Sequence, residues 1–162
     1  MNFFRSFCAS VCLLLLTPSL PAWGLEVGQS IVMPALTTLE GKTVSAQQLQ
    51  GKYLIVQIWA SWCPYCHKQN MNLQKLAQQL APDKALIIGL SVDREVSQAQ
   101  KYSEQHALRF TVAMMTPELA AAFGKRRGIP ELYVIDPSGR VVQKDFGLMV
   151  DADLFELKKY GQ

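Results

Sequence analysis

A strand that leads directly into a helix, with two cysteines at the junction, constrains this sequence more than any other feature. The apolar run over residues 52–58 predicts a buried strand, and a helical pattern extends from about Pro64 to Leu80. Cys63 and Cys66 stand between the two in a C-x-x-C spacing. The start of a helix points free N–H groups and the positive end of its dipole at the first sulfur, which favours the thiolate. Because the thiolate is the species that attacks disulfides, the junction predicts a redox-active dithiol.

The first 24 residues differ in character from the rest of the chain. One positive charge precedes an apolar run over residues 11–16, and Ala22 and Gly24 occupy positions −3 and −1 of a cleavage site. This pattern is typical of a secretory signal peptide, so we expect residues 1–24 to be removed and the protein to be periplasmic. The apolar run is shorter than the roughly 20 residues that a membrane-spanning helix needs, but an uncleaved signal would leave a membrane tether.

The cysteine count narrows the chemistry of the exported chain. Cys8 and Cys12 lie in the predicted signal, so Cys63 and Cys66 are the pair that remains after cleavage. Two cysteines this close cannot form a structural disulfide framework, and they are redox-active, ligands of a metal or haem, or incidental. The net charge of +3 is too small to indicate a nucleic-acid partner. The hydrophobic content of 49% is sufficient for one packed domain over residues 25–162.

Strands and helices alternate along that domain. Several of the apolar runs are continuous instead of alternating, as expected of strands that are covered by helices on both faces. Strands are predicted over 43–45, 53–58, 85–92, 110–114, 131–136 and 140–144, and helices over 64–80, 95–107, 117–123 and 152–160. Thr116 and Asp151 are the expected N-caps of the last two helices. The predicted fold is α/β, a mixed central sheet with helices on both faces and a central α-β insertion.

Two motifs give the chain a resemblance to a known family. The segment from Ile58 to Cys66 resembles the active-site segment of thioredoxin-like proteins, and Gly128-Ile129-Pro130 resembles their cis-proline loop. The lead-in, which is the low-charge segment over residues 25–38 with Pro34, and the insertion over residues 95–123 are similar to those of one branch, the exported TlpA/ResA/DsbE-type thiol–disulfide oxidoreductases. This resemblance covers essentially all of residues 25–162. It implies a thioredoxin-like fold and a cis bond before Pro130.

The resemblance also implies roles for the site residues. Cys63 attacks a client disulfide, and the more buried Cys66 then attacks Cys63 and releases the reduced client. Pro64, which costs no hydrogen bond in the first helical turn, stiffens the loop, and Pro64 and Tyr65 together tune the redox balance. Trp59 and Trp62 either form an apolar collar on the cysteines or pack ordinarily in the core or at the surface.

Beside the cysteines, the cis bond brings the backbone of Ile129 alongside the sulfurs, where its N–H and C=O groups pair with a bound client. The implied partners are a disulfide-bonded protein, with an apocytochrome c as the leading class, and a membrane thiol transporter of DsbD/CcdA type as electron donor. No cofactor and no nucleic acid are expected, and we expect a monomer.

Two proton carriers of the related proteins are absent from this sequence. Gln57 stands six residues before the first cysteine, where thioredoxins have a buried Asp, and Gln69 stands where some members of the exported branch have Glu. Glu131 remains as a candidate for proton transfer to or from Cys66, or else it is a solvent-facing strand residue. His67 either stabilises a thiolate or is simply exposed on the helix. The basic run 125–127 either meets an acidic partner or is a solvated surface.

Other classes of function are open at this point. Cys63 to His67 matches C-x-x-C-H, the pattern of covalent haem attachment, although the preceding strand argues against a small helical cytochrome. A copper carrier would need a histidine beside the two cysteines. A peroxiredoxin would need a Thr-x-x-Cys context, which is absent. An oxidase or isomerase would use the same two cysteines with electrons flowing in the other direction.

Overall fold

The strand that precedes the cysteines lies at the centre of the molecule. The computed structural model describes residues 24–162, and its five-stranded sheet has the order β5-β4-β3-β6-β7 around the central β3 (Tyr53–Trp59). β4 (Ala85–Ser91) is parallel to β3, and β5 (Thr111–Met114) is parallel to β4. β6 (Glu131–Ile135) is antiparallel to β3, and β7 (Val141–Phe146) is antiparallel to β6. The predicted mixed sheet is confirmed.

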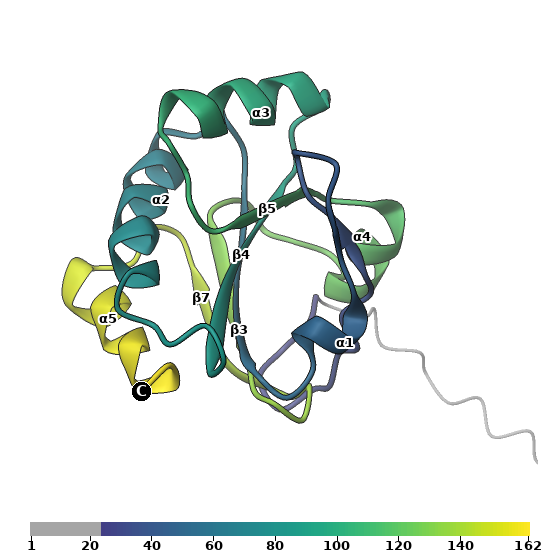
Figure 1. Cartoon of the computed structure of the whole chain (residues 1–162), viewed down its shortest axis with the longest axis vertical. Coiled ribbons are helices and arrows are strands. Elements are labelled where there is room, and N and C mark those ends of the chain that lie inside the picture. Colours follow the sequence, from purple (N-terminus) through teal and green to yellow (C-terminus); the bar gives the residue numbers. More distant parts are fainter. Residues whose placement is uncertain (1–23) are drawn as a thin grey trace, which may run out of the picture.

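Helices cover both faces of this sheet (Figure 1). One face, here called the α2 face, is covered by α2 (Pro64–Ala77), α3 (Val96–Gln105), α5 (Asp151–Glu156) and the 3₁₀ helix η1 (Leu157–Tyr160). The other, here called the α4 face, is covered by α4 (Pro117–Phe123), α1 (Ala46–Leu49) and the lead-in, with its hairpin of β1 (Leu36–Thr37) and β2 (Thr43–Val44). Each face therefore has its own hydrophobic cluster, as the continuous apolar strands predicted.

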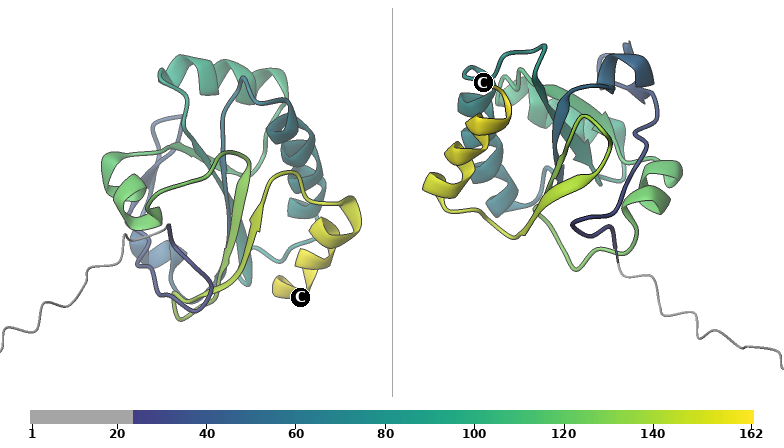
Figure 2. Two further views of the ribbon diagram at one scale, coloured as in Figure 1. Left: turned by 180° about the vertical axis from the view of Figure 1, so that it is seen from behind. Right: turned by 90° about the horizontal axis from the view of Figure 1, so that it is seen from below.

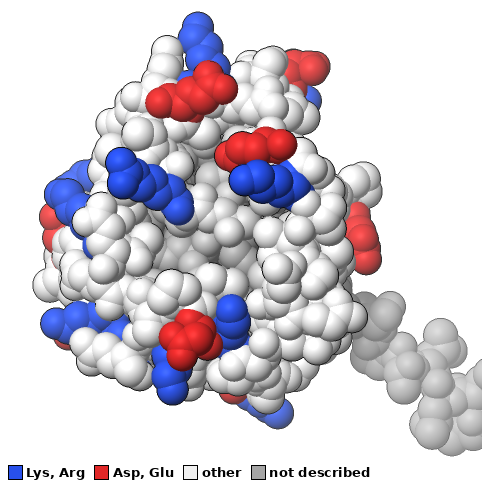
Figure 3. All heavy atoms as spheres, in the orientation of Figure 1, with Lys and Arg blue, Asp and Glu red and all other residues white. Residues whose placement is uncertain are grey.

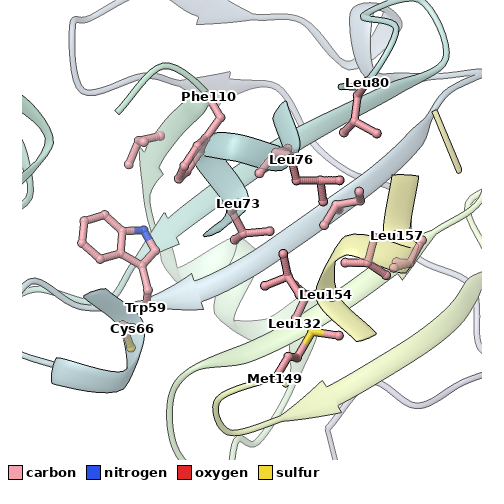
Figure 4. Close-up of a cluster of buried hydrophobic side chains, with 14 of the residues drawn as sticks. Trp59, Cys66, Leu73, Leu76, Leu80, Phe110, Leu132, Met149, Leu154 and Leu157 are labelled. Carbon is pink, nitrogen blue, oxygen red and sulfur yellow. The ribbon is translucent and has the colours of Figure 1, made fainter. Parts of the chain in front are cut away.

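Successive residues of β3 point to opposite faces, because side chains alternate along a strand. Val56 and Ile58 belong to the cluster of the α4 face, whereas Ile55 and Trp59 belong to that of the α2 face. All four of these side chains are fully buried. In Figure 4, Trp59 and Cys66 lie at one end of the cluster on the α2 face, which continues through leucines of α2, α5 and η1 and also contains Phe110, Leu132 and Met149. Both cysteines thus pack in the hydrophobic cluster of the α2 face.

The lead-in and the C-terminal helix are held by different faces. The lead-in runs beside α4, and the Leu25 N–H donates to the carbonyl of Phe123 at 2.8 Å (Figure 2). α5 packs against α2, and Asn72 Nδ2 donates to Asp151 Oδ1 at 2.9 Å. The predicted signal peptide, residues 1–24, lies outside the described residues except for Gly24. Among residues 24–162, no helix combines the length and apolar character that a membrane crossing requires.

Several helix boundaries differ from the sequence prediction, and α3 spans Val96–Gln105 within the predicted 95–107. α2 ends at Ala77 with Gln78 as its C-cap, before Leu80. Asp151 is the first residue of α5, and the N-cap is Val150. Ser45, predicted as a strand residue, instead caps the short helix α1, with a capping box between Ser45 and Gln48. Thr116 caps α4 as predicted. At Ser45 the cap depends on local hydrogen bonds that apolar periodicity does not report.

Candidate active site

The two cysteines are joined as a disulfide at the N-terminus of α2. Cys63 is the N-cap residue of α2, and its Cα lies 5.2 Å from that of Cys66. The Cys66 N–H donates to the Cys63 sulfur at 3.1 Å. Cys63 is 5% exposed, while Cys66 is fully buried. The Cys63 sulfur therefore occupies the place of a capping acceptor, where N–H donors and the helix dipole stabilise negative charge.

The proline loop lies beside this sulfur. The bond between Ile129 and Pro130 is cis, as the resemblance implied. The Cys63 sulfur lies 3.9 Å from the carbonyl oxygen of Ile129. Pro130 itself is buried, and β6 begins at the next residue. The loop thus brings a backbone edge to the more accessible of the two sulfurs.

Apolar side chains around the disulfide are unusually exposed. Trp62 is 67% exposed and Tyr65 is 63% exposed, both within the cysteine loop. Phe146 is 56% exposed and lies against Gly128 of the proline loop, where an added Cβ would meet its ring at 3.4 Å. Trp59, by contrast, is fully buried and packs beside Tyr102 with ring centroids 4.8 Å apart. Of the two tryptophans before the cysteines, only Trp62 is therefore available to a client.

A buried carboxylate that the sequence analysis did not single out holds the cysteine loop. Asp93 is 6% exposed, and its carboxylate accepts hydrogen bonds from the Ser61 N–H at 3.0 Å and the Ser61 hydroxyl at 2.9 Å. It also accepts from the Ser91 hydroxyl at 2.8 Å. Its place directly after a buried strand was the available sequence signal, because parallel strands end at the same edge of a sheet. Asp93 is a positioning residue of the loop that carries Cys63.

Neutral amides occupy the polar positions beneath Cys66. Gln57 is fully buried on the α2 face, and its Nε2 donates to Asn70 Oδ1 at 2.6 Å. Asn70 Nδ2 in turn donates to the Tyr102 hydroxyl at 3.3 Å. The Tyr102 hydroxyl also pairs with His67 Nδ1 at 3.0 Å. Burial raises the pKa of Tyr102, and the hydrogen bond with Asn70 acts in the opposite direction. This chain runs from a partly exposed histidine to the strand that precedes the cysteines.

Gln69 has a structural partner of its own. Its Oε1 accepts a hydrogen bond from the Met149 N–H at 2.9 Å, and the side chain is fully buried. The amide therefore fastens the segment before α5 to the first half of α2. An ionised Glu at this position would keep the acceptor, but it would place a charge inside the core.

Glu131 is not the solvent-facing strand residue that the sequence analysis allowed, since it is 2% exposed. Its Oε1 lies 3.5 Å from Lys144 Nζ, which also contacts Glu26 Oε1 at 2.8 Å. Glu131 alternates with Leu132, which packs in the cluster of Cys66, so its side chain is directed to the α4 face with Tyr133. Burial raises the pKa of Tyr133, and the charge of Glu131 adds to that rise. The arrangement gives no support to direct proton transfer between Glu131 and Cys66.

The histidines and the basic run complete the surroundings. His67 contacts His106, with ring centroids 4.5 Å apart, in addition to its bond with Tyr102. Within residues 24–162 there is no group of three or more His, Cys, Asp or Glu side chains arranged to hold a metal ion. Lys125 and Arg127 are exposed, and they line a shallow groove that reaches Trp62 and Ile129. The site therefore combines one accessible sulfur, an exposed backbone edge and apolar and basic surroundings.

The comparisons with known proteins agree with this geometry. The sequence model of the AhpC/TSA family matches residues 27–144. Thiol-disulfide oxidoreductase ResA of Bacillus cereus is 26% identical over 123 residues, which are 76% of this chain and 71% of that protein. Thiol:disulfide interchange protein DsbE of Haemophilus influenzae is 30% identical over 118 residues, which are 70% of this chain and 62% of that protein.

A solved structure extends the likeness to the fold. The crystal structure of a thiol:disulfide interchange protein of the thioredoxin family from Chlorobium tepidum TLS has a TM-score of 0.73 and 29% identity, covering 82% of this chain and 97% of that chain. Since the family model matches more than half of its residues, the chain belongs to the AhpC/TSA family. It has a thioredoxin-like fold, and its activity is that of a thiol–disulfide oxidoreductase of the ResA and DsbE type.

Proposed function

We propose that this protein reduces disulfide bonds of exported proteins in the periplasm, with Cys63 as the attacking residue and Cys66 as the resolving residue. The observation that carries the assignment is the difference between the two sulfurs. Cys63 caps α2, receives the Cys66 N–H at 3.1 Å and borders the Ile129 carbonyl, while Cys66 is fully buried behind it. A capped, accessible sulfur is the better thiolate, and a buried neighbour is protected from the client.

The proposed reaction takes place in two exchanges. The Cys63 thiolate attacks one sulfur of the client disulfide, so that a Cys63–client disulfide forms and the other client sulfur leaves as a thiolate that takes up a proton. Cys66 then loses its proton and attacks the Cys63 sulfur, which forms the Cys63–Cys66 disulfide and releases the second client thiolate. Two electrons pass to the client, and the protein ends oxidised. A thiol donor must supply two electrons to restore the dithiol.

The cellular setting is proposed from the sequence and the relatives together. The pattern over residues 1–24 supports export by a cleaved signal, and the Leu25 N–H bond to Phe123 is compatible with a chain that begins there. The periplasm is oxidising, so a reductase there needs electrons from across the membrane. A membrane thiol transporter of DsbD/CcdA type is the proposed donor, and an apocytochrome c is the leading client. Pro64 and Tyr65 are proposed to tune the potential of the pair.

The order of attack is tested by removing one sulfur at a time. Cys63→Ala is expected to lower the rate of client disulfide reduction to the uncatalysed level, because no attacking thiolate remains. Cys66→Ala is expected to attack once and then accumulate a mixed disulfide with the client, visible as a dithiothreitol-sensitive adduct by mass spectrometry. Adducts on the Cys63→Ala variant and none on the Cys66→Ala variant would reverse the two roles.

The direction of electron flow is tested by the equilibrium reduction potential of the Cys63–Cys66 pair. We expect a value closer to that of thioredoxin, about −270 mV, than to that of a strong oxidant, about −120 mV. Equilibration of the purified protein with glutathione or dithiothreitol redox buffers, read by thiol alkylation, gives this number. A value near −120 mV would assign the protein to oxidation of client dithiols instead.

A further inference from the structure

A shallow groove of about 500 Å³ opens beside the active site, next to the loop that carries the cysteines. Trp62, the neighbour of Cys63, forms one end of the groove, and Ile129, whose carbonyl borders the Cys63 sulfur, forms part of its wall. The residues that shape it include Trp62, Val92, Ala120, Lys125, Arg127 and Ile129. A polypeptide whose cysteine meets Cys63 therefore has a continuous path into this groove.

The charged residues that line the groove are all basic. Lys125 and Arg127 line it and are exposed, and no acidic residue is among the residues that line it. None of the three ion pairs found within residues 24–162 involves either cation, and residues 1–23 contain no Asp or Glu that would neutralise them. The face seen in Figure 3 is different, since acidic side chains lie beside several of its basic ones. The groove thus presents two cations that no carboxylate of the described chain balances.

Arg126, which lies between them, also lines the groove, but part of its guanidinium is buried. It is only half-buried as a residue, but its Nη1 atom is fully buried, and its charge acts on Tyr133 by lowering the pKa that burial raises. The guanidinium is therefore turned toward the Tyr133 side of the α4 face. Lys125 and Arg127, on either side of it in the sequence, are both exposed. The run 125–127 is divided into one partly buried cation and two exposed ones.

The spacing to the sulfur fixes which part of a client the two cations reach. Arg127 and Lys125 stand two and four residues before Ile129, in a loop that bends at residues 127–129, and an extended client advances about 3.3 Å per residue. A client that lies along this loop with its cysteine at Cys63 would bring residues about two to four positions away opposite Arg127 and Lys125. Carboxylates at those positions would be attracted to the groove, and cations would be repelled.

We propose that this groove recognises an acidic segment that flanks the target cysteine, so that clients with Asp or Glu two to four residues from that cysteine are preferred. This inference rests on the proposed function, because it concerns the client of the same two cysteines. Trp62 supplies the apolar contact next to the sulfur, and Lys125 with Arg127 supplies the charge selection. The occupant is an extended polypeptide, since the groove is shallow and is bordered by Ile129, whose backbone carbonyl lies beside the Cys63 sulfur.

The test compares matched disulfide peptides as substrates of the full, reduced protein. The peptides differ only at two residues, which stand two and three positions from the target cysteine. These two residues are Asp-Asp, Asn-Asn or Lys-Lys, and each pair is tested on the N-terminal and on the C-terminal side of the cysteine. On one of the two sides we expect kcat/KM for Asp-Asp to exceed that for Asn-Asn by about fivefold at low salt, as expected of two exposed ion pairs. The ratio is expected to fall toward one at about 0.5 M NaCl because of screening.

Two double variants locate the source of the preference. Lys125→Gln with Arg127→Gln is expected to reduce the Asp-Asp to Asn-Asn ratio to about one. The control, Lys84→Gln with Lys158→Gln, removes two exposed cations far from the cysteines, because Lys84 precedes β4 at the opposite end of the sheet. The control is expected to keep the fivefold ratio. A preference that survives in the first variant, or is lost equally in both, overturns the proposal.

The outcome also separates this inference from the proposed function. If the wild-type protein reduces the Asn-Asn peptides but shows a ratio of one on both sides, the groove proposal fails and the reductase assignment stands. If it reduces none of the peptides, the reductase assignment fails first. The protein could also show an Asp-Asp to Asn-Asn ratio of one and bind phosphatidylglycerol vesicles, with that binding abolished by the Lys125 and Arg127 substitutions. This result would assign the groove to a lipid surface and overturn the proposal.

Discussion

The two faces of the sheet differ in the kind of polar side chain that they bury. On the α2 face, beneath the disulfide, the fully buried polar side chains of β3 and α2 are the amides of Gln57, Gln69 and Asn70. On the α4 face, behind the proline loop, the buried polar group is the carboxylate of Glu131, which pairs with Lys144. The buried polar groups between β3 and α2 are therefore neutral, Asp93 after β4 is the buried carboxylate that holds the cysteine loop, and the buried ion pair lies across the sheet.

This difference has a consequence for how the protein responds to pH. Amides bind no proton in the ordinary range, so the groups packed under Cys66 keep the same charge when the solution changes. The ion pair on the other face supports the loop from behind, and it also ties down the lead-in, since Lys144 Nζ donates to the Leu25 carbonyl at 2.9 Å. The comparison thus separates neutral amides between β3 and α2 from an ion pair on the α4 face.

The largest expected effect comes from breaking the buried ion pair. Lys144→Met leaves the Glu131 carboxylate buried without its cation, and the free energy of unfolding is expected to fall by about 3 kcal/mol in urea titrations. The matched control is Lys68→Met, because Lys68 and Asp151 form an exposed pair at 3.8 Å whose loss costs less than about 1 kcal/mol. The reduction potential of the cysteines should change little in either variant. A large change of potential in Lys144→Met would contradict the separation of the two faces.

The second prediction concerns the amide pair under Cys66. Gln57→Leu or Asn70→Leu alone leaves one buried amide without its partner and is expected to cost about 1–3 kcal/mol of stability. The double variant is expected to cost less than the sum, because both polar groups are then gone and Tyr102 still pairs with His67. A double-mutant cycle by urea denaturation measures the coupling energy. Strict additivity would mean that the 2.6 Å contact contributes nothing to stability.

A third prediction sharpens the contrast by putting a carboxyl among these neutral amides. Gln57→Glu places an ionisable group in the buried position beside the cysteines, and burial raises the pKa of such a carboxyl. The rate at which the mixed disulfide is resolved is then expected to show an additional inflection between about pH 5 and 9. Stopped-flow measurements over this range give the profile. Gln50→Glu adds the same charge in an exposed turn before β3, and its profile should match the wild type.

The smallest effect is expected in the turn between β6 and β7. The Asp136 carboxylate accepts from the Ser138 hydroxyl at 2.6 Å and from the Arg140 N–H at 3.0 Å. The hydrogen bond from Ser138, followed by that from Arg140, holds the pKa of Asp136 below its usual value. A lowered pKa in the folded state means that ionised Asp136 stabilises the protein above the unfolded-state pKa, near 3.9, and that this contribution is lost as pH falls through the folded-state value.

Asp136→Asn is therefore expected to lower the free energy of unfolding at pH 7 by less than about 1 kcal/mol, because the group is partly exposed to solvent. The difference from wild type should be the same at pH 6 and should shrink below about pH 3.5. A difference that grows on acidification would show that the sign of the linkage is wrong.

Much of the fold and of the site was accessible from the sequence. The strand before Cys63, the helix after it, the later strands and the cis bond before Pro130 agree with the structure. Periodicity and the C-x-x-C spacing are local properties, and local properties are what a sequence displays directly. The role of Asp93 was missed because its partner Ser61 lies 32 residues away and no spacing rule connects them.

The sequence by itself determined that two cysteines meet at the start of a helix behind a buried strand, because backbone hydrogen bonding and hydrophobic periodicity act between near neighbours. Only the tertiary structure decided which polar groups lie beneath those cysteines. Glu131, adjacent in sequence to the cis-proline, is directed to the α4 face, while Asn70, from the middle of α2, is joined to Gln57. Whether a strand side chain reaches one face or the other depends on register and packing across the sheet, and those are set by contacts between residues that are distant in the chain.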